Sequence, residues 1–277
     1  MVRVAALLLG LLAAAPVAAG GPERVVSMNL CTDQMAMLLA GPGQLVSVSF
    51  LARDPESAVL WREAGAFPVN HGLAEEIFPL KPDLVLAGTY TSRATVEMLR
   101  RLGLRVEEFP LEASFADIRA NLSRMGALLG REEAAAEAVA ALDRALAEAR
   151  ASEGARRPRA APYHAAGYTS GAGTLADEIV AAAGLGNIAA ERGLRGMTRL
   201  PLEVLAVEAP ELLIVPPPSK GESLATAVPE HPAFAAARTA AGEAAVTGPS
   251  WTCGGPFTAL AVRALAEARA RLTGDRG

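Results

Sequence analysis

The sequence holds little of what enzymes and metal sites are usually built from. Histidine occurs 3 times and cysteine 2 times among 277 residues, and aromatic residues make up 4% of the chain. The G-x-S-x-G elbow of secreted hydrolases is absent, as are the phosphate-binding, dinucleotide-binding and H-E-x-x-H motifs. We therefore expect no catalytic residues and no enzyme activity.

Two alternatives to a protein without chemistry stay open. A site for a free metal ion needs several His and carboxylate side chains at one point, which three scattered histidines supply poorly. A secreted hydrolase could use Cys253 with His71, His164 or His231, although no spacing pairs them. Both alternatives are weaker than a binding protein.

The charge of the chain also excludes a class of partner. A net charge of −4 and a pI near 5.6 offer no basic footprint, so nucleic acid is not an expected ligand. Hydrophobic residues reach 51%, although many of them are alanine, and 277 residues suffice for one large domain or two of ordinary size.

The N-terminus predicts export. "MVR" precedes "VAALLLGLLAAA", and small residues follow, with Val17 and Ala19 suiting the −3 and −1 positions of a cleavage site. The apolar run is too short to span a bilayer, and no second run like it exists. We predict that residues 1–19 are a cleaved signal peptide and that the mature protein is exported and soluble.

One unit of sequence occurs twice in the chain. "AEEIFPLKPDLVLAG" at 74–88 matches "PLEVLAVEAPELLIV" at 201–215 in register: Glu75 corresponds to Glu203, Pro82 to Pro210, and the apolar strand residues follow. A second pair, "LLAGPGQLVSV" at 38–48 and "AAAGLGNIAAE" at 181–191, predicts a helix, a Gly cap, a turn and a short strand in each half. The offsets of the two pairs differ, which places an insertion of about fifteen residues in the first half, at 50–72.

These repeats predict an α/β fold of two similar lobes with central, mainly parallel sheets. We place the N-terminal lobe at 20–113 and the C-terminal lobe at 156–277. The segment 114–155 between them is rich in helix formers and carries an apolar stripe of Val139, Leu142 and Leu146. Ser114 and Gly130 suit the start and the end of a first helix, and we expect a single long helix over 131–150 to join the lobes as a stiff connector.

The layout resembles a known family. A signal peptide, two α/β lobes, a helical connector and "LKPDLVLAG" after a Glu are similar to the periplasmic binding proteins of ABC importers for ferric siderophores, haem and cobalamin. "RVVSMNLCTDQMAMLLAG" resembles the opening strand and helix of that family, but has Cys31-Thr32-Asp33-Gln34 where members usually have small residues and Thr-Glu. The resemblance covers nearly all of the mature chain.

The resemblance implies a function and a partner. It implies a monomeric periplasmic protein, without a cofactor of its own, that carries an iron chelate (siderophore or haem) or a corrinoid such as cobalamin to a membrane permease. In this family one surface glutamate on each lobe docks into the permease, and the matching positions are Glu75 and Glu203. Equal spacing on two lobes fits two permease subunits.

Ligands of open α/β sheets bind beyond the carboxyl ends of the strands, and this rule selects the candidate ligand-binding residues. Flat aromatic rings and guanidinium groups among them suit a large, partly apolar ligand. The first lobe contributes Asn29, Cys31, Phe50, Arg53, Tyr90 and Arg93, and the second contributes Tyr168, Arg195, Trp251 and Cys253.

The two cysteines allow three interpretations. An even pair in an oxidising compartment is a candidate disulfide. However, Cys31 and Cys253 are both expected at the cleft, where a bridge would staple the lobes together and obstruct the ligand. A disulfide and two free thiols are equally compatible with the sequence, and ligation of a metal centre ranks last.

Overall fold

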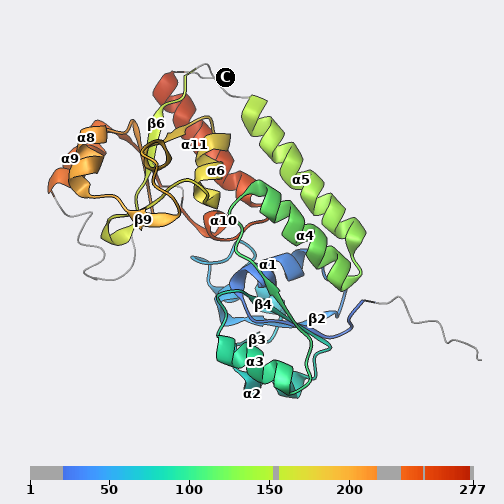
Figure 1. Ribbon diagram of the computed structural model, residues 1–277. Coiled ribbons are helices and arrows are strands. Elements are labelled where there is room, and N and C mark those ends of the chain that lie inside the picture. The colour runs from blue at the N-terminus through green and yellow to red at the C-terminus, as the bar shows by residue number, and fades with distance from the viewer. Residues whose placement is uncertain (1–20, 152–155, 217–231, 246, 275–277) are drawn as a thin grey trace, which may run out of the picture.

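The computed structural model describes residues 21–151, 156–216, 232–245 and 247–274, and shows two α/β lobes connected by helices (Figure 1). The predicted signal peptide lies outside the described residues. Among the helices that are described, none is long and apolar enough to cross a membrane. The predicted fold class is confirmed.

The N-terminal lobe contains a parallel sheet in the order β3-β2-β1-β4-β5. β1 and β4 are fully buried in its centre, as expected for strands covered on both faces. β3 lies within the insertion predicted from the repeat offsets. The elements are β1 (Val25–Ser27), α1 (Leu30–Leu39), β2 (Leu45–Ser49), β3 (Val69–Asn70), α2 (Ala74–Ile77), β4 (Leu84–Gly88), α3 (Arg93–Arg101) and β5 (Val106–Phe109).

The C-terminal lobe repeats the plan with the parallel order β11-β10-β6-β8, and adds an antiparallel ribbon of β7 and β9. Its strands are β6 (Arg159–Pro162), β7 (Tyr168–Ser170), β8 (Gly186–Asn187), β9 (Met197–Arg199), β10 (Leu212–Val215) and β11 (Gly242–Ala245). Its helices are α6 (Leu175–Ala182), α7 (Ile188–Glu191), α8 (Leu202–Glu208), α9 (Pro232–Ala240), α10 (Pro249–Thr252) and α11 (Thr258–Thr273).

The repeat seen in the sequence is also a repeat of hydrogen bonds. In the first lobe the Asp83 carboxylate accepts from the backbone N–H of Arg24, at 3.0 Å. In the second, the Glu211 carboxylate accepts from the backbone N–H of Arg159, at 3.2 Å. The acid that follows each repeated proline therefore holds the start of the first strand of its lobe beside the strand that follows the acid: β1 beside β4, and β6 beside β10.

The two arginines make matching bonds as well. The Arg24 guanidinium donates to the carbonyl oxygen of Leu80 at 2.7 Å, and that of Arg159 donates to the carbonyl oxygen of Glu208 at 3.2 Å. Leu80 and Glu208 stand at the same position of the repeat, near the end of its helical segment. Both lobes thus use an arginine and an acid at equivalent positions to connect the repeated helical segment and its following strand to the first strand of the lobe.

The short strand expected after the Gly cap of the second lobe is β8, which ends at Asn187. It is shorter than its counterpart β2, and α7 occupies residues 188–191. The Asn187 side chain accepts from the backbone N–H of Ala189 and caps the helix. A cap followed by alanines favours a helix over a strand.

The connection between the lobes consists of α4 (Phe115–Leu129) and the long helix α5 (Glu132–Ala151). Gly130, in the left-handed conformation at φ 68°, ends α4 and reverses the chain. The helices lie side by side (Figure 1), and a Cβ at Gly126 would approach that of Ala135 to 2.4 Å. Leu142 and Leu146 of α5 belong to an apolar core that contains residues of both lobes.

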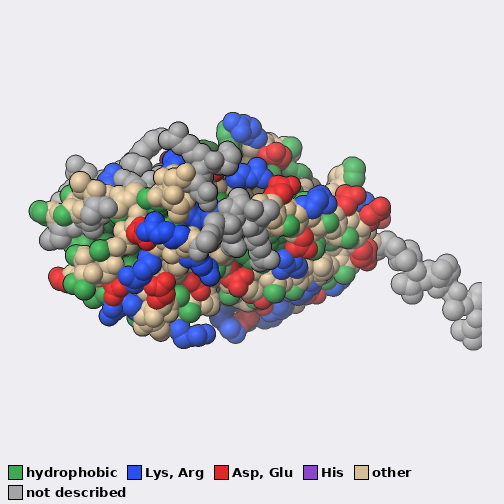
Figure 2. Space-filling model, turned by 90° about the horizontal axis from the view of Figure 1, so that it is seen from above, with side chains coloured by type: hydrophobic (Ala, Val, Ile, Leu, Met, Phe, Trp, Pro, Cys, Tyr) green, Lys and Arg blue, Asp and Glu red, His purple; other side chains and the backbone are tan. Residues whose placement is uncertain are grey.

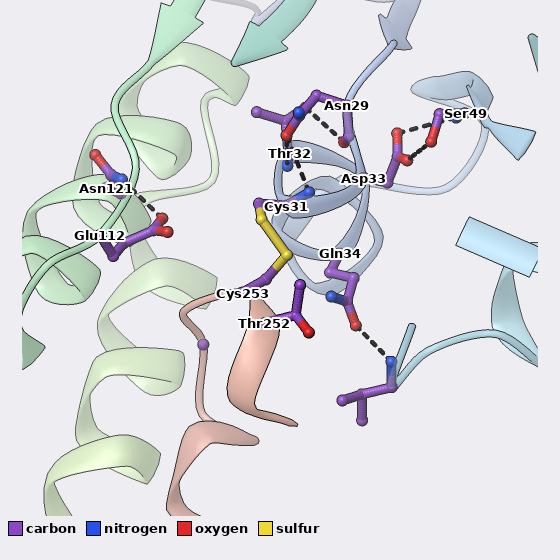
Figure 3. Close-up of a disulfide and its surroundings, with 12 residues drawn as sticks. Asn29, Cys31, Thr32, Asp33, Gln34, Ser49, Glu112, Asn121, Thr252 and Cys253 are labelled. Atoms are coloured by element: carbon purple, nitrogen blue, oxygen red, sulfur yellow. Dashed lines mark hydrogen bonds between the residues drawn. A yellow bond between two sulfur atoms is a disulfide. The ribbon is translucent and has the colours of Figure 1, made fainter. Parts of the chain in front are cut away.

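A second covalent connection joins the lobes at their interface. Cys31 at the start of α1 forms a disulfide with Cys253, which follows α10 (Figure 3). The disulfide interpretation is therefore confirmed, and the free-thiol one is wrong because the structure has no free cysteine. No group of three or more His, Cys, Asp or Glu side chains suited to a metal ion occurs in the described part of the chain.

The residues around the disulfide make the junction tight. Leu30 and Ala58 of the N-terminal lobe form a buried cluster with Cys253 and Phe257 of the C-terminal lobe. A Cβ at Gly254 would lie 2.5 Å from Cγ1 of Ile118, so glycine is needed for the close backbone approach. The "CGGPF" segment is thus seated on the other lobe.

Breaking the cross-link should destabilise the protein strongly. Because the bridge closes a loop of 222 residues, the loop-entropy model gives a loss of about 5 kcal/mol in the free energy of unfolding for Cys31→Ser combined with Cys253→Ser. Urea unfolding followed by circular dichroism measures this loss. Each single variant breaks the same bond and should lose nearly as much as the double variant. A double variant as stable as the wild type would contradict a stabilising role.

Candidate functional site

A small pocket lies at the carboxyl ends of the N-terminal lobe's central strands. Its volume is about 50 Å³, and it is lined from the β1–α1 turn, from 88–90 after β4, and from 109–112 after β5. Three predicted ligand-binding residues, Asn29, Cys31 and Tyr90, meet here. The rule that selected them from the sequence therefore leads to a real concavity beside the disulfide.

The β1–α1 turn is shaped by the side chain of Asn29. Its Oδ1 accepts from the backbone N–H groups of Cys31 at 3.0 Å and Thr32 at 3.5 Å, which caps α1. A Cβ at Gly88 would lie 2.9 Å from Nδ2 of Asn29. Glycine at the end of β4 thus leaves room for the Asn29 amide on the pocket wall.

Glu112 is the buried acid of the pocket and was not predicted from the sequence. Its Oε1 accepts from Nδ2 of Asn121 at 2.8 Å, and Gly254 of the other lobe packs against it, since a Cβ there would lie 3.0 Å from Cγ of Glu112. Burial raises the pKa of Glu112 above its ordinary value, and the hydrogen bond from Asn121 partly opposes the rise. Nothing in its local sequence distinguishes it, because Gly254, which buries it at the lobe junction, lies far along the chain.

A buried polar network supports the floor of the site (Figure 3). Asp33, with no exposed surface, accepts from both the backbone N–H and the hydroxyl of Ser49. The hydroxyls of Ser27 and Thr32 bond each other at 2.8 Å next to it. Burial raises the pKa of Asp33 to about 6, against the lowering effect of its hydrogen bonds to Ser27 and Ser49.

Of the predicted aromatic residues, Phe50 and Tyr90 follow the carboxyl ends of β2 and β4. Tyr168 instead begins β7, because β6 ends at Pro162, and Trp251 lies on α10. Phe50 directly follows β2 and stacks on His71 with ring centroids 5.1 Å apart. Tyr90 is 84% exposed, and Tyr168 is 38% exposed with the Arg199 guanidinium 5.4 Å from its ring centroid. Trp251 on α10 is partly buried against the main core. Tyr90 and Phe50 therefore offer the most free aromatic surface among the four.

The predicted arginines do not gather around the pocket. The Arg53 guanidinium donates to the carbonyl oxygens of Ala64 and Phe67, so it holds the loop that follows β2. Arg93 is exposed on α3 and lies 3.8 Å from Glu97. The backbone of Arg195 forms an isolated parallel β-bridge with Ala172. Cys253 is fully buried and contacts the site through its disulfide bond to Cys31, which lines the pocket.

Glu75 and Glu203 are both exposed, in the first turns of α2 and α8. The helical segments that carry them end at residues with left-handed backbones, Lys81 at φ 48° and Ala209 at φ 43°. These two strained positions correspond in the repeat. The two glutamates thus hold equivalent places on the two lobes.

The surface in Figure 2 carries positive and negative side chains intermixed, without a field of one sign. This agrees with the net charge of −4. Of the hydrolase candidates, Cys253 is in a disulfide and has no thiolate, and burial lowers the pKa of His164. His231 lies outside the described residues.

The comparisons with known proteins identify the family. The family model "Periplasmic binding protein" matches residues 25–247. The chain belongs to this family. Its members are solute-binding proteins of ABC transporters, which bind small molecules and are not enzymes. The predicted family is therefore confirmed.

Individual relatives differ in their ligands. "Cobalamin-binding protein" of Halobacterium salinarum is 31% identical over 198 residues, which are 70% of this chain and 53% of that protein. This chain thus spans about half the length of the curated relatives it matches. The periplasmic heme-binding protein RhuT from Roseiflexus sp. RS-1 has a TM-score of 0.72 at 23% identity, covering 90% of this chain and 99% of that one.

A second solved structure has the same fold and another ligand. The periplasmic vitamin B12 binding protein BtuF of Vibrio cholerae has a TM-score of 0.67 at 20% identity, with coverage of 91% of this chain and 98% of that one. Likenesses at such identities establish the fold alone. The ligand has to be argued from this chain's own residues.

The buried Asp33 should make stability depend on pH in a defined direction. Its folded pKa of about 6 exceeds the ordinary 3.8, so its contribution is fully present below about pH 3.8 and is lost as the pH rises through about 6. Asp33→Asn removes this titration. From about pH 4 to pH 7 the variant should gain about 2 kcal/mol in free energy of unfolding relative to the wild type.

Urea unfolding of both proteins across this pH range measures the difference, in which other titrating groups cancel. Asp54→Asn is the control of opposite sign, because hydrogen bonds from Ser57 and Glu56 lower the pKa of Asp54. Parallel pH profiles for the wild type and Asp33→Asn would contradict the assignment.

Proposed function

We propose that the protein is the periplasmic binding component of an ABC importer that captures an iron chelate or a corrinoid between its lobes. The observation that carries the proposal is the pocket at the carboxyl ends of β1, β4 and β5, beside the lobe junction. Membership of the periplasmic binding protein family supports it. Residues 1–19 would direct the chain to the periplasm and would then be cleaved off.

The ligand would extend from the pocket across both lobes. Tyr90 and Phe50, after strands of one lobe, and Tyr168, at the start of β7 in the other, offer exposed rings that suit the flat, partly apolar face of a chelate or macrocycle. Asn29 and Trp251 would complete the contacts nearest the junction. The protein would perform no chemistry and would hand its ligand to the permease as a monomer.

A thermal-shift screen of the mature protein tests the ligand class. Ferric siderophores, haem, cobalamin and other corrinoids form the panel. A true ligand at one hundred times its dissociation constant adds about 2.7 kcal/mol, which raises Tm by roughly 5 °C or more. Bare Fe³⁺, Zn²⁺ and Mn²⁺, each with and without EDTA, are the controls. A shift with a bare ion that EDTA reverses, and none with a chelate, would favour the free-ion alternative.

The docking role of Glu75 and Glu203 has its own test. Both are exposed and equivalent in the repeat, so Glu75→Ala with Glu203→Ala should leave ligand affinity unchanged and abolish uptake through the reconstituted permease. Glu133→Ala with Glu267→Ala removes the same charge from exposed positions on α5 and α11 and should transport normally. Lost ligand binding in the first pair, or normal uptake by it, would refute docking.

A further inference from the structure

The size of the strand-end pocket limits what can enter it. At about 50 Å³ it has room for roughly three or four water-sized groups. A tetrapyrrole or a whole siderophore cannot fit in such a space, whereas the end of one side arm can. The ring of a large ligand would lie outside, against exposed surface such as Tyr90.

The charge of the pocket selects among side arms. Glu112 is the one acidic residue among the described residues that line it, and neither lysine, arginine nor histidine is present there. Glu112 is 4% exposed, so its charge is little screened by water. A carboxylate arm would meet a like charge without a cation to neutralise it, which is unfavourable.

The hydrogen-bonding groups of the pocket fit a neutral arm. The Glu112 carboxylate has acceptor capacity beyond its bond from Asn121. Asn29 uses Oδ1 to cap α1, while its Nδ2 lies against Gly88 on the pocket wall as a donor. A primary amide offers two N–H donors and one acceptor, and so matches a carboxylate on one side and an amide N–H on the other.

We propose that this pocket recognises a primary-amide arm, and that the ligand is a corrinoid with an amide-bearing periphery rather than a carboxylate-bearing haem or siderophore. The proposal rests on the proposed function and specifies its ligand class. Glu112 is the specificity-determining residue, since it accepts from the amide and repels a carboxylate. The bond from Asn121 and the close packing of Gly254 position its carboxylate.

Calorimetry with two matched corrinoids tests the proposal. The wild type should bind dicyanocobinamide, most of whose arms end in primary amides, about tenfold or more tighter than dicyanocobyrinic acid, whose arms end in carboxylates. Glu112→Gln keeps an acceptor for Asn121 and removes the charge, so the two affinities should converge to within about threefold. Glu63→Gln, with the same charge change on an exposed residue of the same lobe, should keep the wild-type ratio.

Thr89→Val is a second variant, on an exposed pocket residue, that should fold normally. It should weaken cobinamide binding about tenfold if the arm enters the pocket, because it removes a hydroxyl from the wall. An unchanged amide-to-acid ratio in Glu112→Gln, or tighter binding of haem than of cobinamide by the wild type, would overturn the proposal. With either of these results, binding of any chelate or corrinoid would still support the proposed function. If no member of the thermal-shift panel binds, both the amide-arm proposal and the proposed function are overturned.

Discussion

The seating of the "CGGPF" segment on the N-terminal lobe is the constraint on which the site depends. The disulfide fixes Cys253 to the first turn of α1, and the next residue, Gly254, packs closely against Glu112. Cys31 and Glu112 both line the pocket. The walls of the pocket all come from the N-terminal lobe, but contacts from the C-terminal lobe hold them in place. The pocket therefore keeps its shape only while the two lobes keep their relative position.

The floor of the pocket is fixed by polar bonds in the core. Asp33 reaches from α1 to Ser49 at the end of β2, and Asn70 of β3 donates to the carbonyl oxygen of Ser27 at the end of β1. Buried polar groups cost free energy unless they are paired, and when paired they select one arrangement. The three strand ends are thus locked in register exactly where α1 begins and the ligand would approach.

Local sequence patterns predicted the parts of the fold that local chemistry determines. The repeated proline and acid of Asp83 and Glu211 signal the same strand junction twice, and Gly130 ends its helix as a glycine cap should. The features that depend on distant partners could not be predicted. Glu112 is buried because Gly254 of the other lobe packs against it. The Arg53 guanidinium binds backbone carbonyl oxygens and so does not reach the pocket. The two cysteines come within bonding distance only in the folded chain. At α7 the cap on Asn187 outweighed the analogy between the lobes.

Two covalent connections between the lobes change how a ligand can be recognised. The helical pair α4 and α5 alone would allow the lobes to pivot, but the disulfide adds a second point of attachment inside the interface, and a body attached at two points can turn only about the line through them. Recognition must then rest on side chains that are already in place, which reduces the entropy lost on binding. A rigid pocket with one unneutralised carboxylate cannot rearrange to receive a second negative charge. Rigidity at the junction and discrimination by charge in the pocket are thus consequences of the same contact between Gly254 and Glu112.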